Sequence, residues 1–182
     1  MTEQLVVLRL GHRIPRDFRV TTHVCLTARA FGADGLVLAD VVDTALEQTV
    51  RDVTQRFGGT FWIKMDRPWR QVMKDWNAKG GDIVHLTAYG LLLPQVIDEI
   101  RASHNPKLVV VGAEKVPGEA YGLATWNVAI TNQPISEVSA LAVFLDRYFE
   151  GKQFSTEFRN AEVKIVPSAR GKQVVNLTEK RT

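Results

Sequence analysis

The chain has 182 residues, of which 45% are hydrophobic and 24% charged, and its formal net charge is +3. These values are typical of one globular domain with a full hydrophobic core, and the mildly basic charge permits a polyanionic partner without requiring one. The single cysteine, Cys25, excludes an internal disulfide and favours a reducing compartment. No signal peptide and no apolar run long enough to span a membrane is present, so we expect a cytoplasmic protein without a membrane partner.

Short apolar runs alternate with helical patterns along the chain. The runs predict strands at 5–10, 35–39, 61–63, 82–86, 108–111 and 126–130, and the helical patterns cover 21–31, 44–57, 68–78, 92–101 and 136–149. This alternation predicts an α/β fold with a mainly parallel sheet flanked by helices. Alternating residues at 161–166 and 172–175, with turn residues between them, predict a C-terminal β-hairpin. We therefore expect a domain at 1–150 and a hairpin extension at 151–182.

Arginines crowd the loop that follows the first predicted strand. Arg9, Arg13, Arg16 and Arg19 occur there with one acid, Asp17. Arginines this close repel each other unless an anion lies among them, and phosphate matches the guanidinium fork. A solvated basic loop is the alternative.

Three loops follow predicted strands, beginning after Leu86, Val111 and Ile130. In an open α/β sheet, the loops at the carboxyl ends of neighbouring strands form the crevice in which ligands bind. These loops are therefore the predicted ligand site.

Several other kinds of site are excluded. The chain contains no G-x-G-x-x-G, no Walker A motif and no G-x-S-x-G elbow. One cysteine and four scattered histidines give no metal-ligand spacing, so no metal is expected.

The remaining motifs together resemble one family, the archaeal tRNA cytidine 2′-O-methyltransferases that modify the T-loop, within the SPOUT superfamily. They are the runs 8–13 (LRLGHR), 21–23 (TTH), 28–32 (ARAFG), 85–87 (HLT), 111–117 (VGAEKVP), 132–134 (NQP) and 136–137 (SE), with Arg16, Asp17 and Arg19. The resemblance covers nearly the whole chain. It implies a C-terminal trefoil knot, S-adenosyl-L-methionine bound in that knot, tRNA as substrate and a homodimer, for which we expect the helix at 136–149 to form the interface.

With this cofactor, the three strand-end loops supply the expected contacts. The predicted cofactor-binding residues are Leu86, Gly112, Ala113, Glu114, Lys115, Val116, Ile130, Thr131, Asn132, Gln133, Pro134, Ile135, Ser136 and Glu137. Some have simpler alternatives. Glu114 could be a surface charge paired with Lys115, and Ser136 and Glu137 could be an N-cap and a first-turn acid.

The catalytic group departs from the superfamily pattern. Many 2′-O-methyltransferases of the SPOUT superfamily have an asparagine and an arginine six positions apart ahead of a Phe-Gly pair. When this sequence is aligned on Phe31-Gly32, Val20 and Leu26 occupy the positions of that asparagine and arginine. The arginine must therefore come from elsewhere. The candidate catalytic residues are Arg19, Arg13, Arg9 and His23, and we favour Arg19, at the start of the first predicted helix.

Two other functions stay open. One is a non-catalytic RNA-binding module, with a knot-like or doubly wound fold, that keeps the basic loop without a working cofactor site. The other is a small-molecule nucleotide-binding enzyme of ordinary doubly wound topology. The loops at 112–117 and 132–137 favour the methyltransferase.

Overall fold

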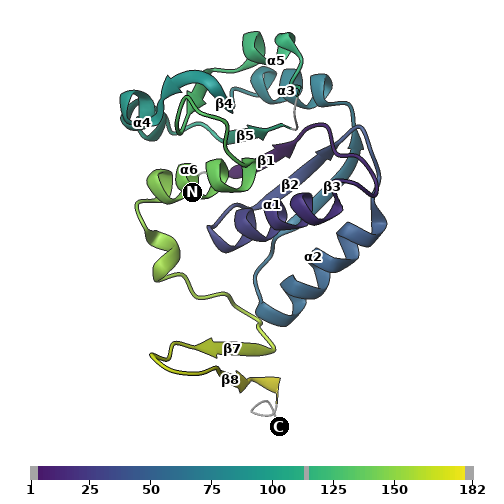
Figure 1. Cartoon of the computed structure of the whole chain (residues 1–182), viewed down its shortest axis with the longest axis vertical. Helices are drawn as coiled ribbons and strands as arrows, with labels where there is room; N and C mark the ends of the chain where they lie inside the picture. Colours follow the sequence, from purple (N-terminus) through teal and green to yellow (C-terminus); the bar gives the residue numbers. More distant parts are fainter. Residues whose placement is uncertain (1–3, 113–114, 179–182) are drawn as a thin grey trace.

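A computed structural model describes residues 4–112 and 115–178. Six strands form the main sheet: β1 (Leu5–Arg9), β2 (Gly35–Ala39), β3 (Trp62–Arg67), β4 (Asp82–Leu92), β5 (Lys107–Val111) and β6 (Trp126–Ala129). The helices are α1 (Phe18–Ala30), α2 (Thr44–Phe57), α3 (Trp69–Ala78), α4 (Leu93–Ala102), α5 (Gly118–Leu123) and α6 (Glu137–Phe149). A 3-10 turn, η1 (Lys152–Phe154), leads to a hairpin of β7 (Val163–Val166) and β8 (Gln173–Asn176) (Figure 1).

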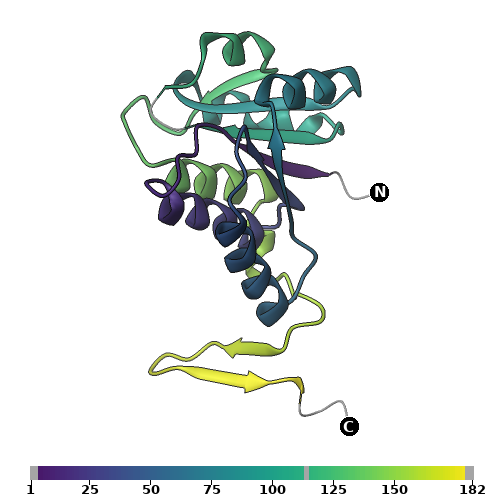
Figure 2. The same cartoon turned by 90° about the vertical axis from the view of Figure 1, so that its right-hand side faces the viewer.

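The main sheet is parallel throughout and has the strand order β3-β2-β1-β5-β4-β6. β1 and β5 lie at its centre and are buried along their whole length, as their β-branched apolar runs predict for strands covered on both faces. One core lies beneath α1, α2, α4 and α6, and a second lies beneath α3 and α5. Helices α1 and α6 pack against each other (Figure 2). The predicted α/β class and parallel sheet are confirmed.

The start of α1 differs from the sequence prediction. The helix begins at Phe18 with Asp17 as its N-cap residue, whereas Thr21 and Thr22 lie inside it. Both threonines are buried, and the Thr22 hydroxyl donates to the carbonyl of Phe18 at 2.8 Å. A hydroxyl can bond either to free N–H groups at a helix start or to a carbonyl one turn earlier, so two adjacent threonines do not fix the start.

Two other local predictions also need correction. The sequence Thr44-Ala45-Leu46-Glu47 predicts a capping box that opens α2, but Asp43 is the N-cap residue, and its carboxylate accepts a hydrogen bond from the Leu46 amide at 3.0 Å. Helix α5 lies where the sequence predicts only a loop. It has six residues, of which two are glycine, and this is too short for helical periodicity to be recognised.

The segment between β6 and α6 lies against an irregular part of β4. β4 pairs with β6 at two places, and the register shifts between Leu86 and Leu91. The Asn132 side-chain amide donates to the carbonyls of Ala88 and Gly90 at 2.7 and 3.2 Å. The chain after β6 is thus held close to the backbone of residues 88–90 before it returns across the sheet to α6. These contacts place the two segments against each other, and the trefoil knot that the resemblance implies stays a prediction.

The C-terminal hairpin is confirmed. β7 and β8 pair antiparallel, with Ile165 opposite Val174, and lie beyond the main sheet (Figure 1). Backbone hydrogen bonds from Glu162 to Arg56 and from Gly59 to Arg159 fasten its base to the end of α2. Within the described residues, no helix has both the length and the apolarity needed to cross a membrane.

Candidate functional site

A cavity of about 520 Å³ lies at the carboxyl ends of β1, β4 and β5 and beside the segment that follows β6. This is the edge of the sheet where the sequence predicts a ligand crevice. Its walls combine apolar and polar side chains with backbone of the three loops. The residues that line it are Arg9, Arg13, Arg16, Asp17, His85, Leu86, Thr87, Ala88, Tyr89, Val111, Gly112, Val116, Tyr121, Ile130, Thr131, Gln133, Pro134, Ile135, Glu137 and Ala140.

Most of the predicted cofactor-binding residues are brought together at this cavity. Those that line it are Leu86, Gly112, Val116, Ile130, Thr131, Gln133, Pro134, Ile135 and Glu137. Lys115, Asn132 and Ser136 are exposed and are not part of the lining. Asn132 instead holds the loop at residues 88–90, and Ser136 caps α6 by accepting a hydrogen bond from the Val138 amide at 3.2 Å. Ala113 and Glu114 lie outside the described residues.

The four candidate catalytic residues occupy different places. Arg9 and Arg13 line the cavity. Arg19 and His23 are exposed on α1 and do not line it. Arg19 follows Asp17, which does line the cavity, by two residues, so the backbone of Arg19 lies close to the lining.

Some lining residues are absent from the predicted set of site residues. His85, Thr87 and Tyr89 belong to β4, and Tyr121 belongs to α5. His85 and Thr87 flank the predicted Leu86, and the motif HLT is the signal that could have identified them. Tyr121 has no such signal, because its helix is too short to predict from the sequence.

Arg9 is the most deeply buried cation at the cavity. It is the last residue of β1, its relative exposure is 1%, and its Nη2 lies 2.8 Å from Oε1 of Glu137 at the start of α6. Its Nε donates to the Thr21 hydroxyl oxygen at 3.4 Å. The remaining nitrogen, Nη1, is buried and has no hydrogen-bond partner among the described residues. Such an orphan donor is uncommon in a folded protein and calls for an explanation.

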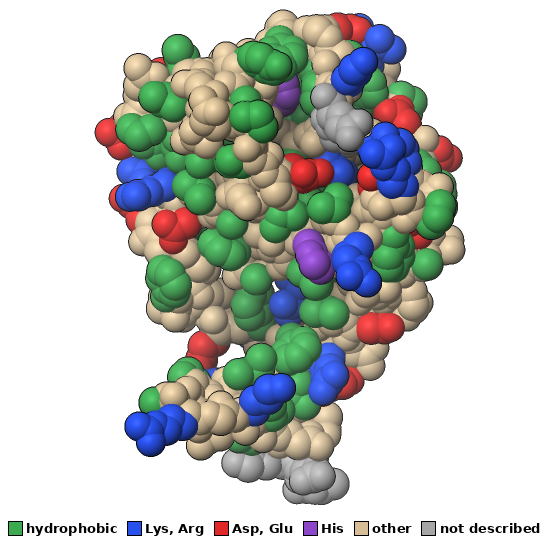
Figure 3. Space-filling view, viewed as in Figure 1, with side chains coloured by type: hydrophobic (Ala, Val, Ile, Leu, Met, Phe, Trp, Pro, Cys, Tyr) green, Lys and Arg blue, Asp and Glu red, His purple; other side chains and the backbone are tan. Residues whose placement is uncertain are grey.

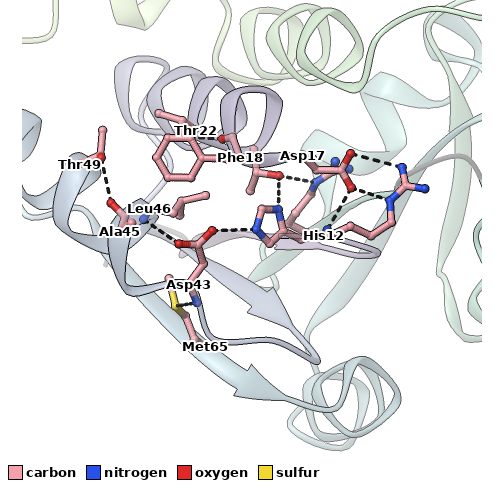
Figure 4. A network of polar contacts seen from close by, with 12 residues as sticks. His12, Asp17, Phe18, Thr22, Asp43, Ala45, Leu46, Thr49 and Met65 are labelled. Carbon is pink, nitrogen blue, oxygen red and sulfur yellow. Dashed lines mark hydrogen bonds and ion pairs between the residues drawn. The ribbon is translucent and has the colours of Figure 1, made fainter. Parts of the chain in front are cut away.

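A network of hydrogen bonds between buried side chains fixes the orientation of Arg9. His12 Nδ1 lies 2.9 Å from the Thr21 oxygen, and His12 Nε2 lies 3.0 Å from Oδ2 of Asp43 (Figure 4). Because a carboxylate only accepts, Nε2 donates to Asp43. In the neutral ring Nδ1 then accepts from the Thr21 hydroxyl, whose oxygen accepts from Arg9. Since Asp43 also caps α2, the orientation of Arg9 is tied to the start of that helix.

A second polar cluster surrounds His85, whose Nδ1 lies 2.8 Å from Oδ1 of Asn127. The Asn127 amide nitrogen donates to the Tyr121 carbonyl at 3.0 Å, so Oδ1 is the acceptor and Nδ1 of His85 carries the proton. The buried Nε2 is therefore an acceptor, and it has no partner in the part of the chain that the structure describes. Burial lowers the pKa of His85 below its ordinary value, which keeps the ring neutral at pH 7.

Charged groups also lie at the cavity mouth. Arg13 is 44% exposed, and its side-chain Nε donates to Oδ2 of Asp17 at 2.8 Å. This hydrogen bond is the main reason that the pKa of Asp17 lies below its usual range. Away from the cavity, Lys and Arg side chains also gather on the C-terminal hairpin, at the bottom of Figure 3, where Lys164, Arg170 and Lys172 are exposed.

Comparison with known proteins identifies the chain's relatives. Residues 57–175 match the family described as tRNA ribose 2′-O-methyltransferase, aTrm56. The chain belongs to the aTrm56 family. It is 54% identical to the tRNA (cytidine(56)-2′-O)-methyltransferase of Methanoregula boonei, over 96% of this chain and 98% of that one. It is 55% identical to the protein of the same name from Pyrococcus abyssi, over 95% of this chain and 88% of that one.

Solved structures outside the aTrm56 family share its fold. The chain is similar to an RNA 2′-O ribose methyltransferase, with a TM-score of 0.63 and 18% identity over 84% of this chain and 58% of that one. It is also similar to the SpoU methyltransferase AviRb from Streptomyces viridochromogenes in complex with AdoMet, with a TM-score of 0.58 and 18% identity over 82% of this chain and 58% of that one. The chain thus spans a little under three fifths of each neighbour. At this identity the likeness establishes the fold alone.

Metal ligands are not gathered at this site. Among residues 4–112 and 115–178, no three His, Cys, Asp or Glu side chains lie close enough together to hold a metal ion.

Proposed function

We propose that this protein transfers a methyl group from S-adenosyl-L-methionine to the 2′-hydroxyl of cytidine 56 in tRNA. The observation that carries the proposal is the cavity formed by the predicted strand-end loops, in a chain 54% identical over 96% of its length to a tRNA (cytidine(56)-2′-O)-methyltransferase. The match covers 98% of that relative's own length. The sequence division into 1–150 and a hairpin extension at 151–182 is kept as part of this proposal.

The cavity fits a nucleoside with a charged side chain. Leu86, Val116 and Ile130 provide apolar walls for the adenine, and backbone groups of the three loops can bond to its edge. A Cβ on Gly112 would overlap the Cγ2 methyl of Val116, so glycine permits the close packing of Val116 on residue 112 at the cavity wall. Two buried polar atoms at the cavity, Arg9 Nη1 and His85 Nε2, have no partner among the described residues and suit a polar ligand.

The bound cofactor supplies an electrophilic methyl group on a sulfonium. In the transfer, the 2′-oxygen forms a bond to the methyl carbon, the carbon–sulfur bond breaks, and the hydroxyl proton must leave. Arg19 is the proposed catalytic residue. An arginine is always protonated and is therefore a poor base. Its role is to hold the phosphate next to the ribose and to stabilise negative charge that develops on the 2′-oxygen, while a phosphate oxygen or water accepts the proton.

A homodimer is the proposed working form. On α6, Val143 is 41% exposed, and next to the cavity Tyr89 and Leu91 are 87% and 60% exposed. Exposed apolar side chains on neighbouring elements are a feature of protein interfaces. The apolar residues Ala140, Val143, Phe144 and Tyr148 predict a second apolar face of α6 that meets a partner. Phe144, however, is fully buried in the chain's own core, so it is not available to a partner.

The deciding experiment is mass spectrometry of tRNA incubated with the protein and methyl-labelled cofactor. The expected product is a single 2′-O-methylcytidine at position 56. Calorimetry should show saturable binding of S-adenosyl-L-methionine and of its demethylated product, and no binding of NAD or ATP. Binding of tRNA without either methylation or cofactor binding would instead support the non-catalytic RNA-binding module.

A further inference from the structure

We infer that Arg9 and Glu137 together bind the zwitterionic amino-acid end of the methyl donor, with Arg9 Nη1 donating to its carboxylate and Glu137 accepting from its ammonium group. The inference rests on the proposed function, because it assigns one part of the proposed cofactor to two residues of the same cavity. It gives a role to the orphan guanidinium nitrogen, which no described residue satisfies.

The ion pair leaves hydrogen-bonding capacity unused on both partners. An arginine and a carboxylate often pair through two parallel hydrogen bonds. Here one nitrogen of Arg9, Nη2, approaches Glu137 Oε1 at 2.8 Å, while Nη1 has no partner among the described residues. Glu137 is 23% exposed and lines the cavity. The pair therefore presents one unpaired donor and one accessible acceptor side by side, which is the arrangement complementary to an α-carboxylate beside an α-ammonium.

The position of Arg9 favours this ligand over an RNA phosphate. Its side chain is almost fully buried at the end of the central strand β1, with Thr21, His12 and Asp43 behind it. The backbone of a folded tRNA is too bulky to bring a phosphate to such a depth. The arginines available to phosphates are those nearer the surface, of which Arg13 is 44% exposed at the mouth.

The support behind Arg9 also indicates a ligand-binding group. Turning the guanidinium so that both Nη1 and Nη2 faced Glu137 would redirect Nε, which donates to Thr21. That threonine is itself held by His12, whose other nitrogen is held by Asp43. The network therefore fixes the side chain in an orientation in which Nη1 has no partner among residues 4–112 and 115–178, and this orientation costs free energy unless a ligand completes it.

The test compares ligands that differ only in the amino-acid end. Wild-type protein is titrated calorimetrically with S-adenosylhomocysteine, with its decarboxylated form, with its deaminated form and with 5′-methylthioadenosine, which lacks both groups. We expect S-adenosylhomocysteine to bind at least tenfold more tightly than each of the other three. Equal affinities for all four ligands would overturn the inference and leave the proposed function intact, whereas no binding of any of them would overturn the proposed function itself.

Variants then assign each preference to a residue. Arg9→Met should abolish the preference for the carboxylate, bringing the affinity ratio of intact to decarboxylated ligand to within threefold. Glu137→Gln should abolish the preference for the ammonium group, bringing the affinity ratio of intact to deaminated ligand to within threefold. In both variants, the affinity for 5′-methylthioadenosine should stay within threefold of wild type. The inference is wrong if folded variants keep the wild-type affinity ratios between intact and truncated ligands. It is also contradicted if a variant loses the same amount of affinity for all four ligands, because such a loss shows a purely structural role.

Two further variants control for folding and for charge. Arg9→Met leaves Glu137 without its counter-ion, so the double variant Arg9→Met/Glu137→Gln, which removes both charges, is measured beside it and should lose both preferences. Arg101→Met is the matched control, because Arg101 is also an ion-paired, part-buried arginine, with Asp98 at 3.2 Å, but lies outside the cavity lining. Its ligand preferences should equal those of wild type, and an equal decrease there would contradict the assignment to Arg9.

Discussion

Gly90, in the irregular part of β4, packs closely on the backbone of β6, so a substitution there tests the fold around the cavity. A Cβ added at Gly90 would lie 2.5 Å from the Val128 nitrogen and closer still to the carbonyl carbon and oxygen of Asn127. Ordinary van der Waals contact begins near 3.4 Å, and the nearest atoms, the carbonyl carbon and oxygen of Asn127, would lie at 2.4 Å, so the backbone of one segment would have to move by about 1 Å. Overpacking of this kind typically costs about 1–3 kcal/mol. For a chain of this length, that corresponds to a fall in Tm of about 2–12 °C.

Gly90→Ala is measured by thermal unfolding and by cofactor calorimetry. Cofactor affinity should fall as well, because Thr87, Ala88 and Tyr89 line the cavity and move with residue 90. The control is Gly122→Ala on α5, where an added Cβ meets nothing within 4 Å. Alanine favours a helix over glycine, so the control should be unchanged or more stable by about 0.4–1 kcal/mol. If Gly90→Ala unfolds at the same temperature as this control, the close approach of the two backbones is refuted.

Four other predictions address RNA binding, catalysis, assembly and pH. Arg13→Ala should flatten the plot of log RNA affinity against log salt by about 0.7–0.9 for each phosphate that the variant no longer neutralises, and an unchanged slope in filter binding would place the RNA elsewhere. Arg19→Lys, which keeps the charge but removes the fork, should reduce kcat far more than cofactor affinity; single-turnover rates of Arg19→Ala within threefold of wild type would exclude Arg19. Leu91→Asp should shift the sedimentation equilibrium from dimer to monomer, and a dilute monomeric wild type with full activity would contradict the dimer. Because burial lowers the pKa of His85 in the folded state, the unfolded chain binds more protons there, so stability should fall as the pH drops below about 6.5; His85→Gln should show a shallower decrease in denaturant titrations between pH 7 and 5.

The fold is largely predictable because its signals are local. The buried strands β1 and β5 are short runs of β-branched residues, and the helices between strands have an apolar face that repeats with helical period. The details that sequence reasoning misses are those in which two local solutions compete. Asp43 and Thr44 can both cap α2, and only the position of His12 beside Asp43 shows which of them the fold uses.

The site is predictable only in part, because a cavity depends on contacts between distant segments. Leu86, Gly112 and Ile130 could be placed there since parallel strands end at one edge of the sheet. The pairing of Arg9 with Glu137, 128 positions away, depends on the return of the chain from β6 across to α6. No periodicity or spacing encodes that return. For the same reason, residues that the sequence groups in one basic loop have different surroundings in the fold.

The sequence places several arginines close together after β1, where their charges would repel each other, and the fold separates their surroundings. The sequence predicts an anion among them, and two of the arginines find protein carboxylates instead, Asp17 for Arg13 and Glu137 for Arg9. Crowding alone is therefore not evidence for bound phosphate at these two residues. Arg19 differs, because it is exposed on the first turn of α1, two residues after Asp17, which lines the cavity. We therefore propose that RNA and cofactor meet different arginines: Arg9, buried and paired with Glu137 at the cavity, binds the cofactor, and Arg19, exposed at the start of α1, acts on the ribose.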